Sequence, residues 1–341
     1  MNQASLSPHA PTRGAHLLAD LGGTHARLSW LSSDGQTEWQ RTLPAADYAS
    51  PDDAIRHFLE LATRDGNRDP AEPPASVNLA VASADRGPLV QFTNAPWSLD
   101  LSRLGHLLGP APVRLMNDFE ALAWSLPLLQ ESDLMHVGGP AIGLSGQEAV
   151  KAVMGPGTGL GLAACIRAAS GWQAVATEGG HATLAAHDPL ERAVLDVLAH
   201  DWPHVSAERL LSGSGLPLLH HAISQAKGQA ARAPTTAVQL IDQALRHQDP
   251  AATETLTAFC DWLGSCAGSA ALTLGARGGL MLGGGILPRI PALLLASNFR
   301  ARFEAKGRFR SYLQQVATPL ITHPNPALLG LKHRLMLDGL I

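Results

Sequence analysis

The chain has few cysteines and no long run of apolar residues. Its three cysteines, Cys165, Cys260 and Cys266, are too few and too irregularly spaced for a disulfide framework or a zinc cluster. No apolar stretch approaches the roughly 18 residues of a membrane span, and the first 15 residues contain no apolar segment typical of a signal peptide. These absences predict a soluble cytoplasmic protein that has no membrane partner.

The sequence also lacks an excess of charge of one sign. It contains 25 lysines and arginines against 29 aspartates and glutamates, a formal net charge of −4. The basic residues are scattered and form no continuous stripe, so we do not expect nucleic acid as a partner. Hydrophobic residues make up 45% of the 341 positions, which is enough for a sizeable core and for two domains.

The first quarter of the sequence alternates as a β-sheet does. "HLLADLG", "HARLSWLSS" and "QTEWQRTLP" are separated by turn residues and predict an antiparallel meander. A helix is expected at about 51–64, followed by strands at "SVNLAVAS" and "GPLVQFTN" and a helix at "LDLSRLGHLLG". The strand "APVRLMND" and the helix "FEALAWSLPLL" complete one α/β unit, which ends in a loop near 130–147.

A second unit begins at "EAVKAVMGPGTGLGLAACIR", where two apolar strands again flank a glycine-rich turn. Helices dominate the middle of the chain, and the periodicity predicts them at about 189–200, 205–225, 235–247 and 251–274. "GGLMLGGGILPRI" then supplies a short buried strand, three glycines and a helix start. The pattern indicates an α/β fold built from two units.

Three glycine-rich turns, at 22–24, 155–161 and 283–285, each follow an apolar strand. Glycine lets backbone N–H groups approach an anion closely and allows a positive φ, so such turns suit phosphates. None matches the dinucleotide fingerprint, because Leu160 or Leu162 stands where its last glycine belongs, and no P-loop motif is present. The pattern therefore disfavours a nicotinamide enzyme and a P-loop ATPase.

Two strand ends carry carboxylates that could act in catalysis. Asp20 precedes the first glycine turn, where a carboxylate beside a triphosphate would need Mg²⁺ between them; alternatively it caps its own turn. Asn117 and Asp118 follow a strand and precede a helix. Asp118 is either a helix N-cap or a base that accepts the proton of a hydroxyl during phosphorylation.

Further polar residues suit the binding of sugar hydroxyls. "TEGGHATL" contains Glu178 and His181, and "HVSAERLLSGSG" places Glu208 at a helix start. Carboxylates and imidazoles bind adjacent hydroxyls, but a structural histidine and an ordinary helix-start acid are equally compatible with this spacing.

Taken together, these stretches resemble the bacterial glucokinases of the non-ROK type, in the group of actin-like ATPases, sugar kinases and hsp70. The matching segments run from residue 17 to residue 331 and are "ADLGGTHARL", "NDFEALAWSLP", "GPGTGLGLA", "EGGHATLAA", "HVSAERLLSGSGL", "GGLMLGGGILPR", "FRARFEAKGRF" and "NPALLGL". The resemblance implies a two-domain α/β, actin-like (ribonuclease H-like) ATPase fold with a central cleft. We expect a small domain at 16–130 and a large one at 131–341, with a C-terminal helix near 326–338 that packs back on the small domain.

The resemblance also implies ATP-dependent phosphorylation of D-glucose at its 6-hydroxyl, with Mg²⁺ and in a homodimer. It assigns Asp118 as catalytic base and Asp20 as the residue that holds Mg²⁺ through water. The sugar-binding residues that it implies are Asn117, Asp118, Glu178, His181 and Glu208. The implied ATP-binding residues are Asp20, Gly22, Gly23, Thr24, Gly157, Thr158 and Gly159, with Gly283, Gly284 and Gly285 on the nucleoside side.

Two alternatives stay open from the sequence. The sugar could be mannose or fructose, or the chain could be a regulatory protein that binds sugar and nucleotide without turnover. The intact Asp118 argues against a pure sensor, which could lose its base. The zinc motif of ROK relatives does not match, because the next cysteine after His181 is Cys260.

Overall fold

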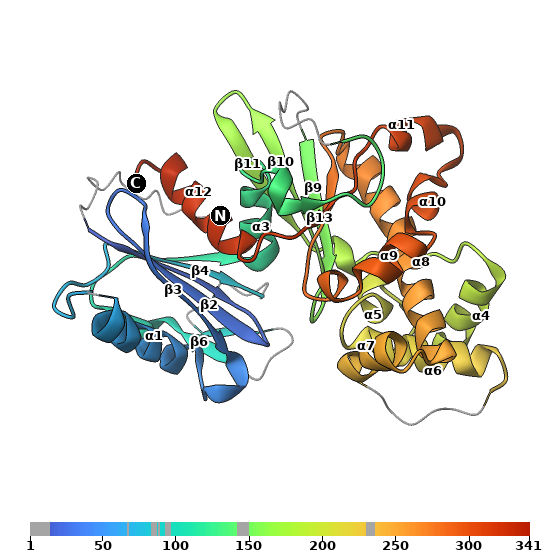
Figure 1. The fold of residues 1–341 in the computed structure, drawn as a ribbon, viewed down its shortest axis with the longest axis horizontal. Coiled ribbons are helices and arrows are strands. Elements are labelled where there is room, and N and C mark those ends of the chain that lie inside the picture. The colour runs from blue at the N-terminus through green and yellow to red at the C-terminus, as the bar shows by residue number, and fades with distance from the viewer. Residues whose placement is uncertain are drawn as a thin grey trace. The chain divides into compact units, whose positions relative to one another are not determined.

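The computed structural model describes residues 14–66, 68–82, 87, 89–92, 97–141, 150–229 and 236–341 (Figure 1). Their packing divides the chain into two compact units, each with its own sheet and helices. Unit 1 takes the described residues up to Leu128 together with Asn325–Ile341, and unit 2 takes Leu129–Pro324. The α/β class expected from the sequence is confirmed.

Unit 1 is built on a five-stranded sheet of order β3-β2-β1-β4-β7. The first three strands are antiparallel, which confirms the predicted meander, and β1, β4 and β7 are parallel. The strands are β1 (His16–Leu21), β2 (His25–Leu31), β3 (Thr37–Pro44), β4 (Ser76–Val81) and β7 (Val113–Asn117). A separate antiparallel ribbon joins β5 (Leu89–Gln91) to β6 (Ser98–Asp100), and a 3₁₀ turn, η1, spans Ala45–Asp47.

Helices cover both faces of this sheet (Figure 1). Leu17, Ala19 and Leu21 of β1 point to one face and share a core with Phe58 of α1 (Pro51–Asp65), as the period of two in a strand requires. α2 (Leu101–Leu108) contributes to the same core. On the other face α3 (Asp118–Ser125) packs against α12 (Pro326–Leu337), and both contact the sheet.

Unit 2 repeats this strand order in a six-stranded sheet, β11-β10-β9-β12-β13-β8. The strands β9, β10 and β11 form an antiparallel meander, while β9, β12 and β13 are parallel. Their bounds are β8 (Leu134–Met135), β9 (Val150–Pro156), β10 (Leu160–Ala168), β11 (Gly171–Thr177), β12 (Leu280–Leu282) and β13 (Leu320–Ile321). The two apolar strands predicted around the second glycine turn are confirmed.

Three strands of unit 2 were not predicted from the sequence, namely β8, β11 and β13. The loop expected near 130–147 contains η2 (Glu131–Asp133) and β8, which pairs with β13. Two residues have no detectable period, so only the partner strand defines β8. β11 was also missed, because it lies at the edge of the sheet and none of its residues is buried.

The helix predicted at 205–225 is wrong as one element. Leu211–Ser214 separate α5 (Ala207–Leu210) from α6 (Gly215–Ala226). The break has a local cause, since the Ser212 hydroxyl accepts a hydrogen bond from the N–H of Gly215 (3.0 Å) and the N–H of Gly213 is bonded outside the helix. The other predicted helices are observed as α4 (Pro189–Leu198), α7 (Ala237–Arg246) and α8 (Pro250–Leu274).

The remaining helical segments of unit 2 are short. They are η3 (Gly179–His181), η4 (Leu287–Arg289), α9 (Pro291–Ala296), α10 (Phe299–Glu304), η5 (Gly307–Phe309) and α11 (Arg310–Gln314). Trp262 and Phe259 of α8 are buried at the centre of the unit 2 core.

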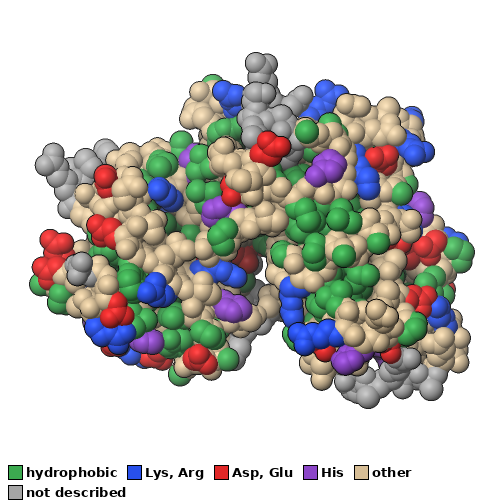
Figure 2. Space-filling model, in the orientation of Figure 1, with side chains coloured by type: hydrophobic (Ala, Val, Ile, Leu, Met, Phe, Trp, Pro, Cys, Tyr) green, Lys and Arg blue, Asp and Glu red, His purple; other side chains and the backbone are tan. Residues whose placement is uncertain are grey.

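The surface carries charged side chains of both signs, mixed with polar and apolar ones over the face in Figure 2. Within the described ranges, no helix is both long enough and apolar enough to cross a membrane.

Candidate active site

In unit 1 the predicted residues gather at one edge of the sheet. Leu21 of β1 pairs with Val81 of β4, and Val81 pairs with Asn117 of β7. Because the three strands are parallel, Asp20 and Asn117 lie at their carboxyl ends, two strands apart, or about 10 Å at the usual strand spacing. The sheet therefore brings Asp20 near the Asn117–Asp118 pair.

Asp20 is held by an arginine that the sequence analysis did not single out. The Arg27 guanidinium donates a hydrogen bond from Nη1 to Oδ2 of Asp20 at 3.0 Å, and the Asp20 side chain is 15% exposed. Burial raises the pKa of the Asp20 carboxyl, and Arg27 opposes this rise. Asp20 and Arg27 are direct partners across the β1–β2 hairpin, so the meander register was the signal that could have found the pair.

The first glycine turn is tight without unusual backbone angles. The N–H of Gly22 donates to the carbonyl of His25 (3.0 Å), and the exposed Thr24 accepts at its own carbonyl from the N–H of Ala45 (2.9 Å). Neither Gly22 nor Gly23 has a positive φ, so a left-handed backbone is not the reason for glycine at these two positions. Among the glycines of the three turns, only Gly284 has one, at 78°.

Asn117, not Asp118, is the N-cap of α3. Its Oδ1 accepts hydrogen bonds from the N–H groups of Phe119 (2.9 Å) and Glu120 (3.2 Å). Asp118 is the first helical residue, and its Oδ1 also accepts from the N–H of Phe119 (2.9 Å). The partial positive charge of the helix N-terminus favours an ionised carboxyl group at this position.

In unit 2 the two glycine turns meet at the carboxyl ends of the parallel strands β9 and β12. A methyl group added at Gly155 would lie 2.3 Å from the carbonyl carbon of Gly283, and one at Gly284 would lie 2.3 Å from the oxygen of Pro156. Backbone therefore packs directly on backbone, and no side chain fits between the turns. At Gly157 and Gly285 an added methyl group would meet nothing within 4 Å, so both turns have an open side.

The segment from Glu178 to His181 packs on the start of β10. A methyl group at Gly180 would lie 1.9 Å from the oxygen of Leu160, so this position requires glycine. The N–H of His181 donates to the carbonyl of Glu178 (3.0 Å) and closes the 3₁₀ turn. The side chains of Glu178 and His181 are both exposed.

Glu208 lies beside this turn and connects it to the start of β10, directly after the glycine turn 157–159. Its Oε1 is 3.7 Å from Nε2 of His181, and its Oε2 accepts a hydrogen bond from the N–H of Leu160 (2.8 Å). The cap of α5 is Ser206, whose hydroxyl accepts from the N–H of Arg209 (3.3 Å). The Glu208 carboxylate therefore reaches across to β10 rather than capping its own helix.

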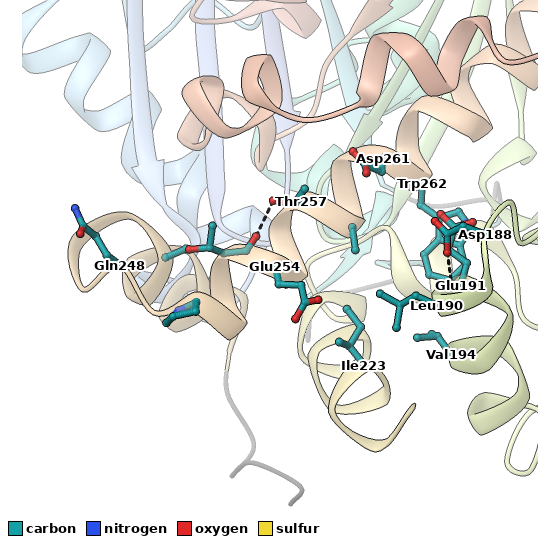
Figure 3. Close-up of a pocket in the computed structure, with 14 residues that line it drawn as sticks. Asp188, Leu190, Glu191, Val194, Ile223, Gln248, Glu254, Thr257, Asp261 and Trp262 are labelled. Carbon is teal, nitrogen blue, oxygen red and sulfur yellow. Dashed lines mark hydrogen bonds between the residues drawn. The ribbon is translucent and has the colours of Figure 1, made fainter. Parts of the chain in front are cut away.

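A cavity of about 730 Å³ lies elsewhere in unit 2, among α4, α6, α7 and α8 (Figure 3). None of the predicted site residues lines it. Its acidic side chains already have partners: Asp261 accepts from the N–H (2.7 Å) and Nδ2 (3.0 Å) of Asn298, and Glu254 pairs with Lys227.

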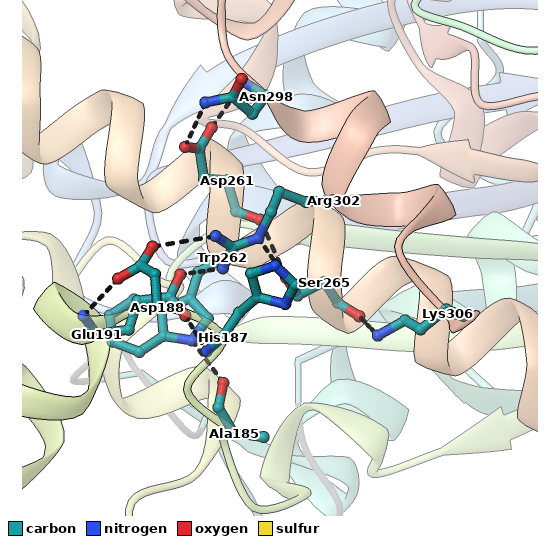
Figure 4. Close-up of polar contacts among 10 residues, drawn as sticks. All are labelled: Ala185, His187, Asp188, Glu191, Asp261, Trp262, Ser265, Asn298, Arg302 and Lys306. Atoms are coloured by element: carbon teal, nitrogen blue, oxygen red, sulfur yellow. Dashed lines mark hydrogen bonds and ion pairs between the residues drawn. The ribbon is translucent and has the colours of Figure 1, made fainter. Parts of the chain in front are cut away.

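Two further acids of this cavity belong to a buried ion network (Figure 4). Arg302 of α10 donates to Asp188 (Nη1 to Oδ2, 3.1 Å) and to the buried Glu191, both at the start of α4. Its Nε donates to the Ser265 hydroxyl of α8 (3.0 Å). The network connects three helices and is accounted for by packing.

The repeated strand order, with a glycine turn at the carboxyl end of β1 in unit 1 and of β9 in unit 2, is the architecture of the actin-like ATPase class that includes the sugar kinases. Among solved structures, a glucokinase from an Antarctic psychrotroph is 35% identical, with a TM-score of 0.78, over 94% of this chain and 98% of that one. A ROK family glucokinase from Streptomyces griseus, in complex with glucose and AMPPNP, is 17% identical with a TM-score of 0.58 over 93% and 98% of the two chains.

Sequence comparisons define the family. The glucokinase of Paramagnetospirillum magneticum is 42% identical over 318 residues, which cover 92% of this chain and 95% of that protein. A bifunctional protein of Burkholderia pseudomallei is 39% identical, but the chain spans only 49% of its length. The sequence profile of the glucokinase family matches residues 17–337, and the chain belongs to this family. It is a kinase that transfers a phosphoryl group from ATP to D-glucose.

Proposed function

We propose that Asp118 is the general base of this reaction. The observation that carries the proposal is its position at the carboxyl end of β7 and the N-terminus of α3, where Asn117 fixes the backbone around it. A carboxylate there can accept the proton of the glucose 6-hydroxyl while the hydroxyl oxygen attacks the γ-phosphorus of ATP and ADP leaves.

We propose sugar-binding roles for Glu178, His181 and Glu208, and also for Asn117 and Asp118. The exposed imidazole and the Glu208 carboxylate face each other at 3.7 Å, a spacing that lets both groups reach neighbouring hydroxyls. A bound sugar shields these polar groups from water, so a hexose that lacks a matching hydroxyl leaves one of them unpaired. That costs free energy, and the set should therefore discriminate among hexoses.

We propose that Gly22, Gly23, Thr24, Gly157, Thr158 and Gly159 contact the ATP phosphates, and that Gly283–Gly285 lie at the nucleoside. The open side of Gly157 and the exposed Thr158 support this role, because an anion can approach their backbone N–H groups. The structure of the Streptomyces griseus glucokinase contains AMPPNP, an analogue of ATP, which supports ATP as the nucleotide here.

Mg²⁺ fits the donor set at Asp20. In the described part of the chain, no group of three or more acidic, histidine or cysteine side chains could hold a metal ion, whereas Mg²⁺ is often held by one carboxylate together with waters and substrate phosphates. We propose that Asp20 holds the ion through water and that Arg27 orients the carboxylate. When bound, Mg²⁺ supplies positive charge to the phosphate oxygens.

We also propose a cytoplasmic homodimer that binds no nucleic acid. Three cysteines without disulfides, two of them buried, support a reducing compartment. Analytical ultracentrifugation at micromolar concentrations tests the dimer, and a single monomeric species would overturn it.

A coupled assay tests the function with glucose, mannose, fructose and N-acetylglucosamine, each with ATP and increasing Mg²⁺. We expect glucose to give the highest kcat/KM and activity to vanish without a divalent ion. A higher kcat/KM for mannose or fructose would reassign the sugar, and full activity in the presence of a strong chelator would remove the metal from the proposal.

A further inference from the structure

The segment Ser206–Gly215 contains Glu208, which has a proposed role, and further residues without one. It carries Glu208 at one end and "SGSG", residues 212–215, at the other. Main-chain contacts join its start to the segment that holds His181: the N–H of Ala207 donates to the carbonyl of Ala182 (2.9 Å), and Thr183 bridges to Ser206. These contacts link the segment directly to the residues that follow the proposed sugar ligand His181.

The same segment holds the turn 157–159 from both sides. At the start of the turn, the carbonyl of Gly157 accepts a hydrogen bond from the N–H of Gly213 (2.8 Å). After the turn, the N–H of Leu160 donates to the Glu208 carboxylate (2.8 Å). Between these two contacts the turn closes on itself, with the N–H of Gly157 donating to the carbonyl of Gly159 (2.7 Å).

Gly213 is fixed in place by its own neighbours. Ser212 is fully buried, and its hydroxyl accepts from the N–H of Gly215. A methyl group at Gly213 would lie 3.1 Å from the oxygen of Gly157, which is closer than most such contacts. Gly213 has no positive φ, so an alanine there can adopt the backbone but must displace the turn slightly.

We propose that Gly213 is a positioning residue that, together with Glu208, couples glucose binding to MgATP binding through the turn 157–159. This inference rests on the proposed roles of Glu208 and of the turn. Glucose on Glu208 restrains the carboxylate that holds Leu160, while Gly213 restrains the other side of the turn. A turn already ordered by the sugar loses less conformational entropy when the nucleotide binds.

The test is a binding cycle on the full chain. Isothermal titration measures the affinity for Mg²⁺-AMPPNP with and without saturating glucose, and the affinity for glucose alone. We expect glucose to tighten nucleotide binding by about 5- to 150-fold, the usual range of such coupling, and nucleotide to tighten glucose binding by the same factor. In Gly213→Ala the factor should fall to about twofold or less, while affinity for glucose alone changes by no more than about twofold.

The matched control is Gly105→Ala, since a methyl group at Gly105 meets nothing within 4 Å and α2 contributes no proposed ligand. It should keep the coupling factor of the parent. The same factor in Gly213→Ala as in the parent, or no coupling in the parent, would overturn the proposal. Failure of the proposed function is a different result: the parent would then produce no glucose 6-phosphate in the coupled assay.

Hydrogen exchange gives a second measurement that needs no variant. Glucose alone should slow deuterium uptake in the peptide that contains residues 157–160 of the parent, because the sugar restrains the Glu208 carboxylate that accepts from Leu160. Unchanged uptake in this peptide at saturating glucose would overturn the coupling even if Gly213→Ala failed to fold.

Discussion

Gly330 of α12 lies against the backbone of Ala121 in α3. A methyl group at Gly330 would stand 1.7 Å from the Ala121 carbonyl oxygen, and the two helices can cross so closely only because that group is absent. α3 begins with the Asn117–Asp118 pair. The position of the proposed base thus depends on a glycine more than 200 residues away in sequence.

We expect Gly330→Ala to lower the free energy of unfolding by about 1–3 kcal/mol, the usual cost of overpacking, and to lower kcat more than it changes the KM for ATP. Urea unfolding and steady-state kinetics measure the two effects. Gly105→Ala should instead leave stability unchanged or raise it, because alanine is favoured over glycine in a helix. Equal kcat values in the parent and in Gly330→Ala would show that the packing of α12 on α3 does not position Asp118.

Asp118→Asn should lower kcat by about 10²–10⁴ and change glucose affinity by less than about tenfold, because a positioned base contributes mainly to the transition state. The coupled assay gives kcat, and titration calorimetry gives the affinity. Asp100→Asn is the matched control, since Asp100 caps α2 and asparagine caps equally well. Near-parent turnover in Asp118→Asn would remove Asp118 from the mechanism.

Glu208→Gln should reduce the preference for glucose over 2-deoxyglucose and N-acetylglucosamine by about tenfold or more, because the site loses a charged hydrogen-bond acceptor for the sugar. The measurement is kcat/KM for the three sugars. Ser206→Ala removes the cap of α5, and it should lower stability by about 1 kcal/mol while leaving the ranking of sugars unchanged. An unaltered ranking in Glu208→Gln would exclude Glu208 as a sugar ligand and leave it only its structural hydrogen bond with the N–H of Leu160.

Stability should fall below pH 6.5 through His16. His16 is fully buried beside the Ser76 hydroxyl (2.8 Å), and burial lowers its pKa from the usual 6.5. The folded chain then keeps His16 neutral while the unfolded chain binds a proton, so stability is present above pH 6.5 and is lost as the pH falls from there toward the lowered pKa. Urea unfolding of His16→Asn between pH 5 and 7.5 should show a slope smaller by up to about 1.4 kcal/mol per pH unit. Identical slopes in parent and variant would contradict this.

Arg302→Met should lower the free energy of unfolding by about 3–5 kcal/mol, because it leaves Glu191, only 5% exposed, as a buried charge without its partner. Thermal and urea unfolding measure this loss. Arg246→Met is the matched control: Arg246 pairs with Asp242 at the surface and is 79% exposed, so no measurable loss is expected. Comparable losses in both variants would show that the network in Figure 4 is no stronger than a surface pair.

Local patterns in the sequence predicted much of the fold. The alternation in β1 to β3 and the glycine turns after β1, β9 and β12 were read from single segments, and the strands are observed. β8 was missed because its two residues form a strand only through β13, which lies some 180 positions later. The break between α5 and α6 depends on Gly213 reaching Gly157, a contact that no local pattern contains.

The sequence was enough to name candidate site residues, but not the contacts that hold them in place. The residues Asp20, Asp118 and Glu208 were named, and their roles stay a prediction. Arg27 on Asp20 and the N–H of Leu160 on Glu208 were missed, since both contacts join separate strands or segments. Asp118 was one candidate for the N-cap of α3, but the cap is Asn117; the two side chains are adjacent and both residue types can cap.

Unit 1 is assembled from chain on both sides of unit 2, and this order governs how the protein emerges from the ribosome. All of Leu129–Pro324 is synthesised before α12, and domains generally fold as their chain becomes complete. Unit 2 can therefore finish folding while the α3 face of unit 1 still lacks Gly330 and the buried leucines of α12. The packing that positions the proposed base is completed only when the last helix is released from the exit tunnel, so translation that stops before Asn325 would leave unit 1 without α12.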